Sequence, residues 1–180
     1  MARYAAFLRG INISNRRVKN DALRICCEEL GFAGVAIFRA SGNVILDADG
    51  QDKAEEVAGR IEAGLAESLG FEVPVFLRSA AQVRAISRHR PFGEDELEAS
   101  GGQVQVSLLA KPPSAATRRK VLALATADDR LAIRGRELYW LPPGRMSDSG
   151  LDLKPIGLLL GASTMRTKGT IEQIAAKHFA

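Results

Sequence analysis

The spacing of apolar and polar residues divides the first half of the chain into short strands and two amphipathic helices. Apolar runs typical of buried strands occupy residues 4–8, 35–38, 44–46 and 73–77. Apolar residues at helical spacing follow Asn20, which can cap a helix that Gly31 ends, and follow Asp52 as far as Gly70. The order over residues 3–78 is therefore β-α-β-β-α-β, as in a ferredoxin-like fold.

The second half repeats most of this order. Strands are predicted where apolar residues alternate or run together, over residues 104–109, 131–133 and 137–141. A helix containing Val121 follows the first of these strands, and Arg134-Gly135-Arg136 has the spacing of a hairpin turn. Helices near 155–160 and from about 167 to 177 close the chain. The pattern predicts an α+β protein with two ferredoxin-like subdomains, βαββαβ followed by βαββαα.

A boundary between the two subdomains is expected at residues 91–102. This segment carries four acidic residues and ends in two glycines. We therefore predict an N-terminal subdomain over residues 1–90, a linker over 91–102 and a C-terminal subdomain over 103–180.

Composition excludes several classes of protein. With 180 residues and 46% hydrophobic residues, the chain can bury a core and is not a disordered protein. No run of about 18 uncharged apolar residues occurs, and the N-terminal apolar run is too short for a signal peptide. The two cysteines, Cys26 and Cys27, are adjacent, which favours free thiols in a reducing compartment. We expect a cytoplasmic protein that does not enter a membrane.

Charge is mild in total but uneven along the chain. The net charge is +4, and arginine outnumbers lysine by 18 to 7. Residues 73–93 and 99–127 each contain four basic residues and no acidic residue, whereas residues 46–72 contain eight acidic residues. Guanidinium groups bind phosphate and carboxylate well, although a GC-rich genome produces the same arginine bias. An anionic partner, either a nucleic acid or a phosphorylated small molecule, is compatible with this pattern.

Four polar segments are candidates for a ligand site. The first links the first strand to the first helix, where backbone N–H groups favour anions, but it lacks the P-loop spacing. The second and third are the turns at 41–43 and 134–136, and the fourth is the basic, hydroxyl-rich segment around Arg166. Each also fits an ordinary turn or helix cap. The residues that we predict to bind a ligand are Arg9, Gly10, Asn12, Ser41, Gly42, Asn43 and Arg166.

Catalytic and metal-binding patterns are sparse. His89 and His178 have no neighbours in sequence that would complete a catalytic triad or a metal site. Trp140, the only tryptophan, fits core or interface packing, and no exposed aromatic platform for bases is visible. We assign no catalytic residue, metal or cofactor.

Several motifs occur together in the order of a bacterial family of unknown function. They are Phe7-Leu8-Arg9-Gly10-Ile11-Asn12, Leu30-Gly31-Phe32, Ser41-Gly42-Asn43-Val44, Phe71–Arg78 and Gly135–Tyr139. Over nearly its whole length the chain thereby resembles the DUF1697 family. The resemblance implies a two-subdomain α+β fold and implies no activity.

The chain departs from that family's pattern in three places. Ile13-Ser14-Asn15 stand where the family usually has glycines, and Phe38-Arg39-Ala40 stand where it usually has tyrosine, isoleucine and glutamine. Near the C-terminus, Arg166-Thr167-Lys168 replace the usual arginine-asparagine-tryptophan. If those family residues serve a ligand, this member has altered its site.

Three hypotheses about function remain open. The first is a binding module for an anionic ligand. The second is an enzyme for a small anionic substrate with a pocket around Arg9, Asn12, Ser41 and Asn43. The third is an interaction protein that forms a homo-oligomer.

Overall fold

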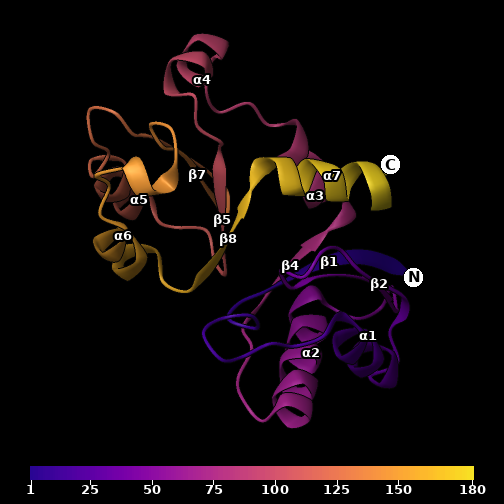
Figure 1. Ribbon diagram of the computed structural model, residues 1–180. Helices are drawn as coiled ribbons and strands as arrows, with labels where there is room; N and C mark the ends of the chain where they lie inside the picture. The colour runs from indigo at the N-terminus through magenta and orange to yellow at the C-terminus, as the bar shows by residue number, and fades with distance from the viewer. The chain divides into compact units, whose positions relative to one another are not determined.

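A four-stranded antiparallel sheet organises the first of two units in the computed structural model, which describes residues 1–180. This unit comprises Met1–Arg84 and Ile174–Ala180. Its strands follow the order β2-β3-β1-β4, and two helices pack on one face of the sheet (Figure 1). The bounds are β1 Ala2–Leu8, α1 Asn20–Glu29, β2 Ala33–Ile37, β3 Asn43–Ala48, α2 Ala54–Leu69 and β4 Val75–Ser79.

The core of the first unit lies between this sheet and helices α1 and α2. Alternate residues of β1 point to that side, and Tyr4, Ala6 and Leu8 belong to the buried cluster. Leu23 and Ile61 meet them from α1 and α2, and both are fully buried.

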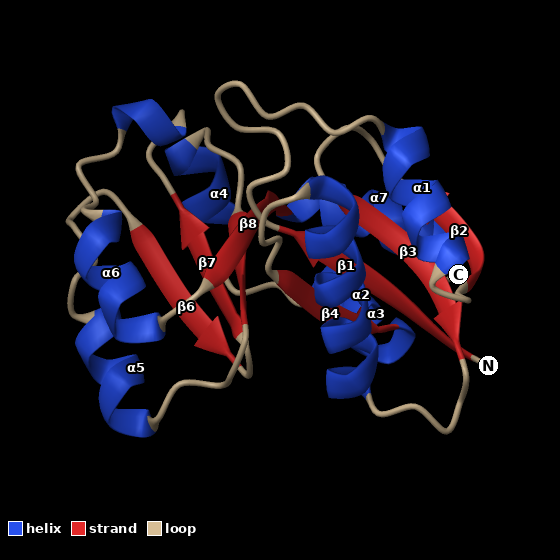
Figure 2. Cartoon of the chain, turned by 90° about the horizontal axis from the view of Figure 1, so that it is seen from below, coloured by secondary structure: helices blue, strands red, loops and turns tan.

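The second unit, Ala85–Gln173, is built on a second antiparallel sheet with the order β6-β7-β5-β8. Helices α5 and α6 cover one face of this sheet (Figure 2). The bounds are α4 Glu94–Ser100, β5 Gln105–Leu109, α5 Ala115–Leu122, β6 Arg130–Arg134, β7 Glu137–Leu141, a 3-10 turn Met146–Asp148, α6 Leu153–Leu160 and β8 Ser163–Thr167. Two further helices, α3 (Ala80–Arg88) and α7 (Lys168–His178), contain the points at which the units divide.

The predicted α+β class is confirmed, with two antiparallel sheets and seven α-helices. The element order of the first half agrees with the prediction through β4. Ser79 and Gln82 form a capping box at the start of α3, since each backbone N–H donates to the other residue's side-chain oxygen, at 2.9 and 3.3 Å. Both predicted hairpins are present as antiparallel pairs, β2 with β3 and β6 with β7.

The predicted order βαββαα for the second half is wrong in one element. Residues Ser163–Thr167 form β8, a strand that pairs with β5 before the last helix begins. Its five residues are polar or charged except for Met165, so the strand has no hydrophobic pattern of its own. Hydrogen bonding to the buried strand β5 holds it in the sheet.

The unit bounds also differ from the expected subdomains. Residues 91–102, expected as a linker, lie inside the second unit and contain α4. The last seven residues, Ile174–Ala180, belong to the first unit, where the Arg84 guanidinium donates to the Phe179 carbonyl at 3.0 Å. No helix of the chain has the length and apolar character needed to cross a membrane.

Candidate functional site

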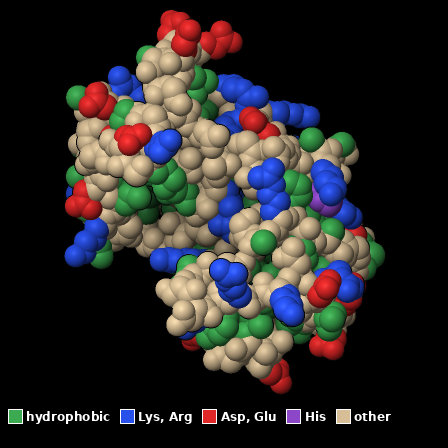
Figure 3. All heavy atoms as spheres, viewed as in Figure 1, with side chains coloured by type: hydrophobic (Ala, Val, Ile, Leu, Met, Phe, Trp, Pro, Cys, Tyr) green, Lys and Arg blue, Asp and Glu red, His purple; other side chains and the backbone are tan.

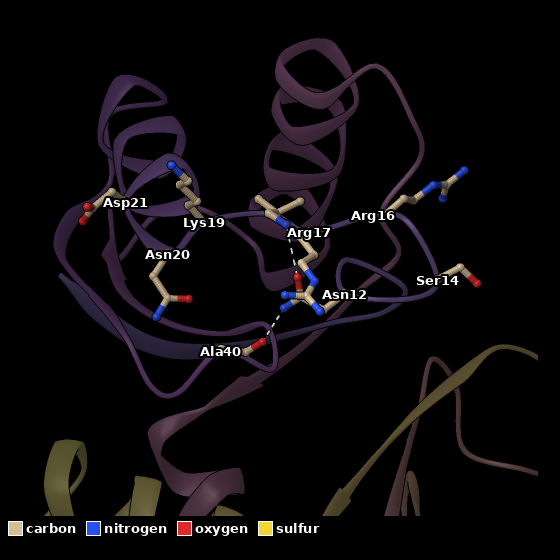
Figure 4. A pocket seen from close by; sticks show the side chains of 9 residues that line it. Asn12, Ser14, Arg16, Arg17, Lys19, Asn20, Asp21 and Ala40 are labelled. Atoms are coloured by element: carbon tan, nitrogen blue, oxygen red, sulfur yellow. Dashed lines mark hydrogen bonds between the residues drawn. The ribbon is translucent and has the colours of Figure 1, made fainter.

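The loop between β1 and α1 forms one wall of a surface pocket of about 610 Å³ (Figure 4). The turn between β2 and β3 contributes its other edge through Ala40. The side chains are mainly polar or basic. The lining consists of Asn12, Ser14, Arg16, Arg17, Val18, Lys19, Asn20, Asp21 and Ala40.

Asn12 joins the two segments that line the pocket. Its side-chain amide N–H donates to the Ala40 carbonyl, and its amide oxygen accepts the Val18 N–H at 3.1 Å. The first bond connects the loop to the β2–β3 turn, and the second closes the loop on itself before α1. Both ends of the amide therefore serve to hold the loop in place.

The predicted Ser41-Gly42-Asn43 turn lies directly beside this loop. The Leu8 N–H donates to the Gly42 carbonyl at 2.8 Å, so the end of β1 is bonded to the turn. The Asn43 side-chain N–H donates to the Phe38 carbonyl at 3.0 Å and to the Ser41 hydroxyl at 2.9 Å. Asn43 is 1% exposed, so these bonds fix the turn from within.

Two cations of the pocket are without acidic partners. The side chains of Arg17 and Lys19 are exposed, and neither forms a salt bridge or side-chain hydrogen bond. Arg16 is engaged elsewhere, because its guanidinium lies 4.3 Å from the centre of the Phe71 ring, and Figure 4 shows it pointing away from Asn12. The only carboxylate of the lining, Asp21, lies 3.7 Å from the Arg24 guanidinium.

The first turn of α1 adds unpaired backbone donors to the pocket. Lys19, with extended backbone, is the N-cap, and no side chain caps the helix. The first helical hydrogen bond runs from the Leu23 N–H to the Lys19 carbonyl at 3.2 Å, so the preceding N–H groups have no acceptor within the helix. Asn20 was predicted to be the cap but occupies the first helical position, where its amide lines the pocket.

The predicted ligand-binding residues of the first unit are close in space. Asn12 lines the pocket, and Ser41, Gly42 and Asn43 follow Ala40 in the adjoining turn. Arg9 and Gly10 precede the pocket at the end of β1 and are not part of its lining. Arg17 and Lys19 were absent from the predicted set, although their place in a basic loop before a helix was a usable signal.

Arg166 lies in the second unit, on strand β8. Its guanidinium donates to the Thr164 hydroxyl at 2.9 Å and to the Met165 carbonyl at 2.8 Å. Burial lowers the pKa of Arg166 to about 10. It remains a cation at neutral pH, and its role in binding a ligand stays a prediction.

The histidines and acidic residues do not form a metal site, because no group of three or more His, Cys, Asp or Glu side chains could hold an ion. His89 packs edge-on against Tyr139 with ring centres 4.9 Å apart, and its Nδ1 lies 3.1 Å from the Arg134 guanidinium. Burial and then the nearby cation Arg134 lower the pKa of His89. Trp140 is buried in the core of the second unit, as predicted.

Comparison with known proteins assigns the chain to a family. Two antiparallel four-stranded sheets and a basic pocket without a metal cluster define an α+β protein with a candidate anion site. The chain belongs to DUF1697, described as a protein of unknown function, whose family model matches residues 1–139.

A solved structure supports the same fold. It is the conserved bacterial protein SP0830 from Streptococcus pneumoniae, which is 19% identical, with a TM-score of 0.75. The alignment covers 98% of this chain and 97% of that one. At this identity the likeness concerns the fold alone. No curated protein matches the chain.

Proposed function

We propose that this protein is a binding module for an anionic ligand, either a phosphorylated metabolite or the phosphates of a nucleic acid. The observation that carries the proposal is the pocket between Asn12 and Asp21, where Arg17 and Lys19 lie without acidic partners. The uncapped start of α1 adds backbone N–H donors, and such helix ends favour negative charge. Cations and N–H groups in one pocket form a donor set that suits phosphate oxygens.

The pocket supports binding more readily than catalysis. An enzyme for a small anionic substrate at Arg9, Asn12, Ser41 and Asn43 would need a general base within reach of the substrate. The carboxylate of the pocket is Asp21, which is exposed and close to the Arg24 guanidinium. The Asn12 amide already bonds backbone groups at both ends.

The test is a titration of the whole chain with inorganic phosphate, a nucleoside triphosphate and a short single-stranded oligonucleotide. The double variant Arg17→Gln/Lys19→Gln is expected to weaken binding of the preferred anion about tenfold or more, because it removes two charge-assisted bonds. Only nucleic-acid binding should fall steeply with salt concentration, with log affinity linear in log salt. The salt slope therefore separates the two ligand classes.

A matched control keeps the net charge equal. The variant Arg119→Gln/Lys120→Gln removes the same two charge types from the exposed surface of α5, far along the chain from the pocket loop. It should bind the anion as the unmodified protein does. Equal losses in both double variants would mean a general charge effect, and no binding of any of the three anions at low salt would overturn the proposal.

Two finer assignments accompany this function. We propose a ferredoxin-like fold for each unit, since in both sheets the first strand lies between the third and the fourth. We also propose a cytoplasmic location, because Cys26 and Cys27 are buried free thiols, which suits a reducing compartment.

Self-association is a second candidate function, favoured by the exposed leucines of α6.

A further inference from the structure

A second pocket, with the opposite hydrogen-bonding character, lies within the second unit. It has a volume of about 720 Å³ and is bounded by the start of β5, the end of β8 and the segment after β7. Apart from Arg145, its side chains carry no positive charge. The lining consists of Gly101, Gly102, Gln103, Gln105, Pro142, Gly144, Arg145, Met146, Ser147, Asp148 and Thr167.

Close backbone packing joins two segments that line this pocket, residues 100–102 and residues 142–144. A Cβ atom on Gly102 would lie 2.4 Å from the Pro142 carbonyl oxygen and 2.6 Å from that of Gly144, so only glycine allows this approach. Ser100 ties the same segments together, because its hydroxyl donates to the Pro142 carbonyl at 2.6 Å and its carbonyl accepts the Gly144 N–H at 2.8 Å. The backbone at Gly102, Pro142 and Gly144, including the Gly144 carbonyl, is therefore held in place before any ligand arrives.

Three acceptors of the pocket have no donor. Gln105 is 6% exposed, and its side-chain N–H donates to the Gln103 carbonyl at 3.1 Å, which leaves its amide oxygen without a hydrogen bond. The Gly144 carbonyl accepts no hydrogen bond. Asp148 accepts the Arg145 N–H at 2.9 Å through Oδ2, and its Oδ1 accepts none. No donor of the chain occupies these three oxygens, so all three are open to N–H donors from a ligand.

We propose that this pocket binds the primary ammonium group of a small molecule. An ammonium group carries three N–H donors and no acceptor, which matches three unpartnered acceptors. The Asp148 carboxylate supplies the compensating charge, and the two neutral oxygens supply direction. Arg145 lines the same pocket and forms no salt bridge with Asp148, so it can meet an acidic group at the other end of the ligand.

Two amines of equal chain length separate the possible sources of the ammonium group. We would titrate the isotopically labelled whole chain with 1,4-diaminobutane and with 4-aminobutanoate, following backbone amide signals by NMR. Both should shift signals of residues 101–105 and 142–148. Tighter binding of 4-aminobutanoate would assign the site to amino acids and their relatives, and tighter binding of the diamine would assign it to polyamines.

Single variants test the acceptors directly. Asp148→Asn should weaken the amine about tenfold or more, because it replaces a charged acceptor. Gln105→Leu, of similar volume, should weaken it severalfold, and Glu98→Gln on the exposed surface of α4 should not change it. The absence of saturable shifts in the unmodified protein at about 10 mM amine, well above a dissociation constant of about 1 mM, would overturn the proposal. Unchanged affinity in Asp148→Asn would overturn it as well.

The outcome is independent of the anion pocket. Arg17→Gln/Lys19→Gln alters only the first unit and should leave amine binding unchanged. If amines bind and phosphate does not, the site in the second unit stands while the proposed function fails.

Discussion

Gly42 allows the β2–β3 turn to pack against the end of β1. Its backbone is left-handed, with φ of 73°, and a Cβ atom there would lie 2.8 Å from Ile11 Cδ1. Gly42→Ala should therefore lower the free energy of unfolding by about 1–3 kcal/mol, through backbone strain and overpacking together. The measurement is urea unfolding, in which the dependence of the unfolding free energy on urea concentration should be the same for both proteins.

Gly59 offers the matched control for that substitution. It lies in the exposed part of α2, and a Cβ atom there would meet nothing within 4 Å. Gly59→Ala should raise the free energy of unfolding by about 0.5–1 kcal/mol, because alanine favours the helix. If Gly42→Ala proved as stable as the unmodified chain, the tight turn described here would be wrong.

Asp129 is a buried carboxylate that holds three segments of the second unit together. It accepts the Trp140 indole N–H at 2.7 Å and the hydroxyls of Ser149 and Thr126 at 2.6 and 2.5 Å. Burial opposes its ionisation, yet the hydrogen bonds from Ser149, Thr126 and Trp140 leave its pKa below the ordinary value. Asp129→Asn should cost about 1–3 kcal/mol at pH 7, measured by urea unfolding.

The sign of the pH effect follows from this lowered pKa. The carboxylate stabilises the folded state fully above the unfolded-state pKa of about 3.9, and this contribution is lost as pH falls through the lower folded-state value. The difference in unfolding free energy between the unmodified protein and Asp129→Asn should therefore shrink below about pH 4. A difference that stayed constant into acid would exclude an ionised Asp129 as its cause.

At the scale of elements, the loop from β1 to α1 depends on one side chain. Asn12→Ala removes the bonds to the Ala40 carbonyl and the Val18 N–H. We expect the Val18 amide to exchange with solvent about fivefold faster or more, which corresponds to about 1 kcal/mol for a lost hydrogen bond. Hydrogen exchange followed by NMR measures this.

Asn12→Asp separates the two bonds of that side chain. Its carboxylate can still accept the Val18 N–H but cannot donate to Ala40. Protection of Val18 should persist in Asn12→Asp and be lost in Asn12→Ala. Equal exchange rates in both variants would show that the loop is held by something other than the Asn12 oxygen.

Elements with a hydrophobic pattern were predictable, and those without one were not. Strands β1, β3 and β4 of the first sheet were recognisable as apolar runs because both of their faces are largely buried. Strand β8 and helix α4 have polar sequences, and β8 exists because β5 offers it a pairing edge. A strand that forms only because it pairs with a strand distant in the sequence has no recognisable pattern in its own residues.

At the scale of the whole chain, the uneven charge seen in sequence appears on the surface. Figure 3 shows acidic side chains gathered over α4, where Glu94, Asp95 and Glu96 open the helix. Sequence also singled out the basic loop before α1 as a candidate site. It could not reveal that Arg16 stacks on Phe71, 55 residues away, because that contact exists only after folding. The basic character of the loop could be predicted from the sequence, but not which of its cations, Arg17 and Lys19, stay available for a ligand.

Exposed leucines on the helical layer of the second unit predict self-association. Leu158 of α6 is 80% exposed, and Leu153 and Leu159 of the same helix are also partly exposed. Burying such side chains against a second copy is favourable. Light scattering should therefore give a mass above 19.4 kDa at high concentration, and Leu158→Glu should restore the single-chain mass. Ile25→Glu, on the exposed face of α1, is the control and should leave association unchanged. A single-chain mass for the unmodified protein at every concentration would exclude this function.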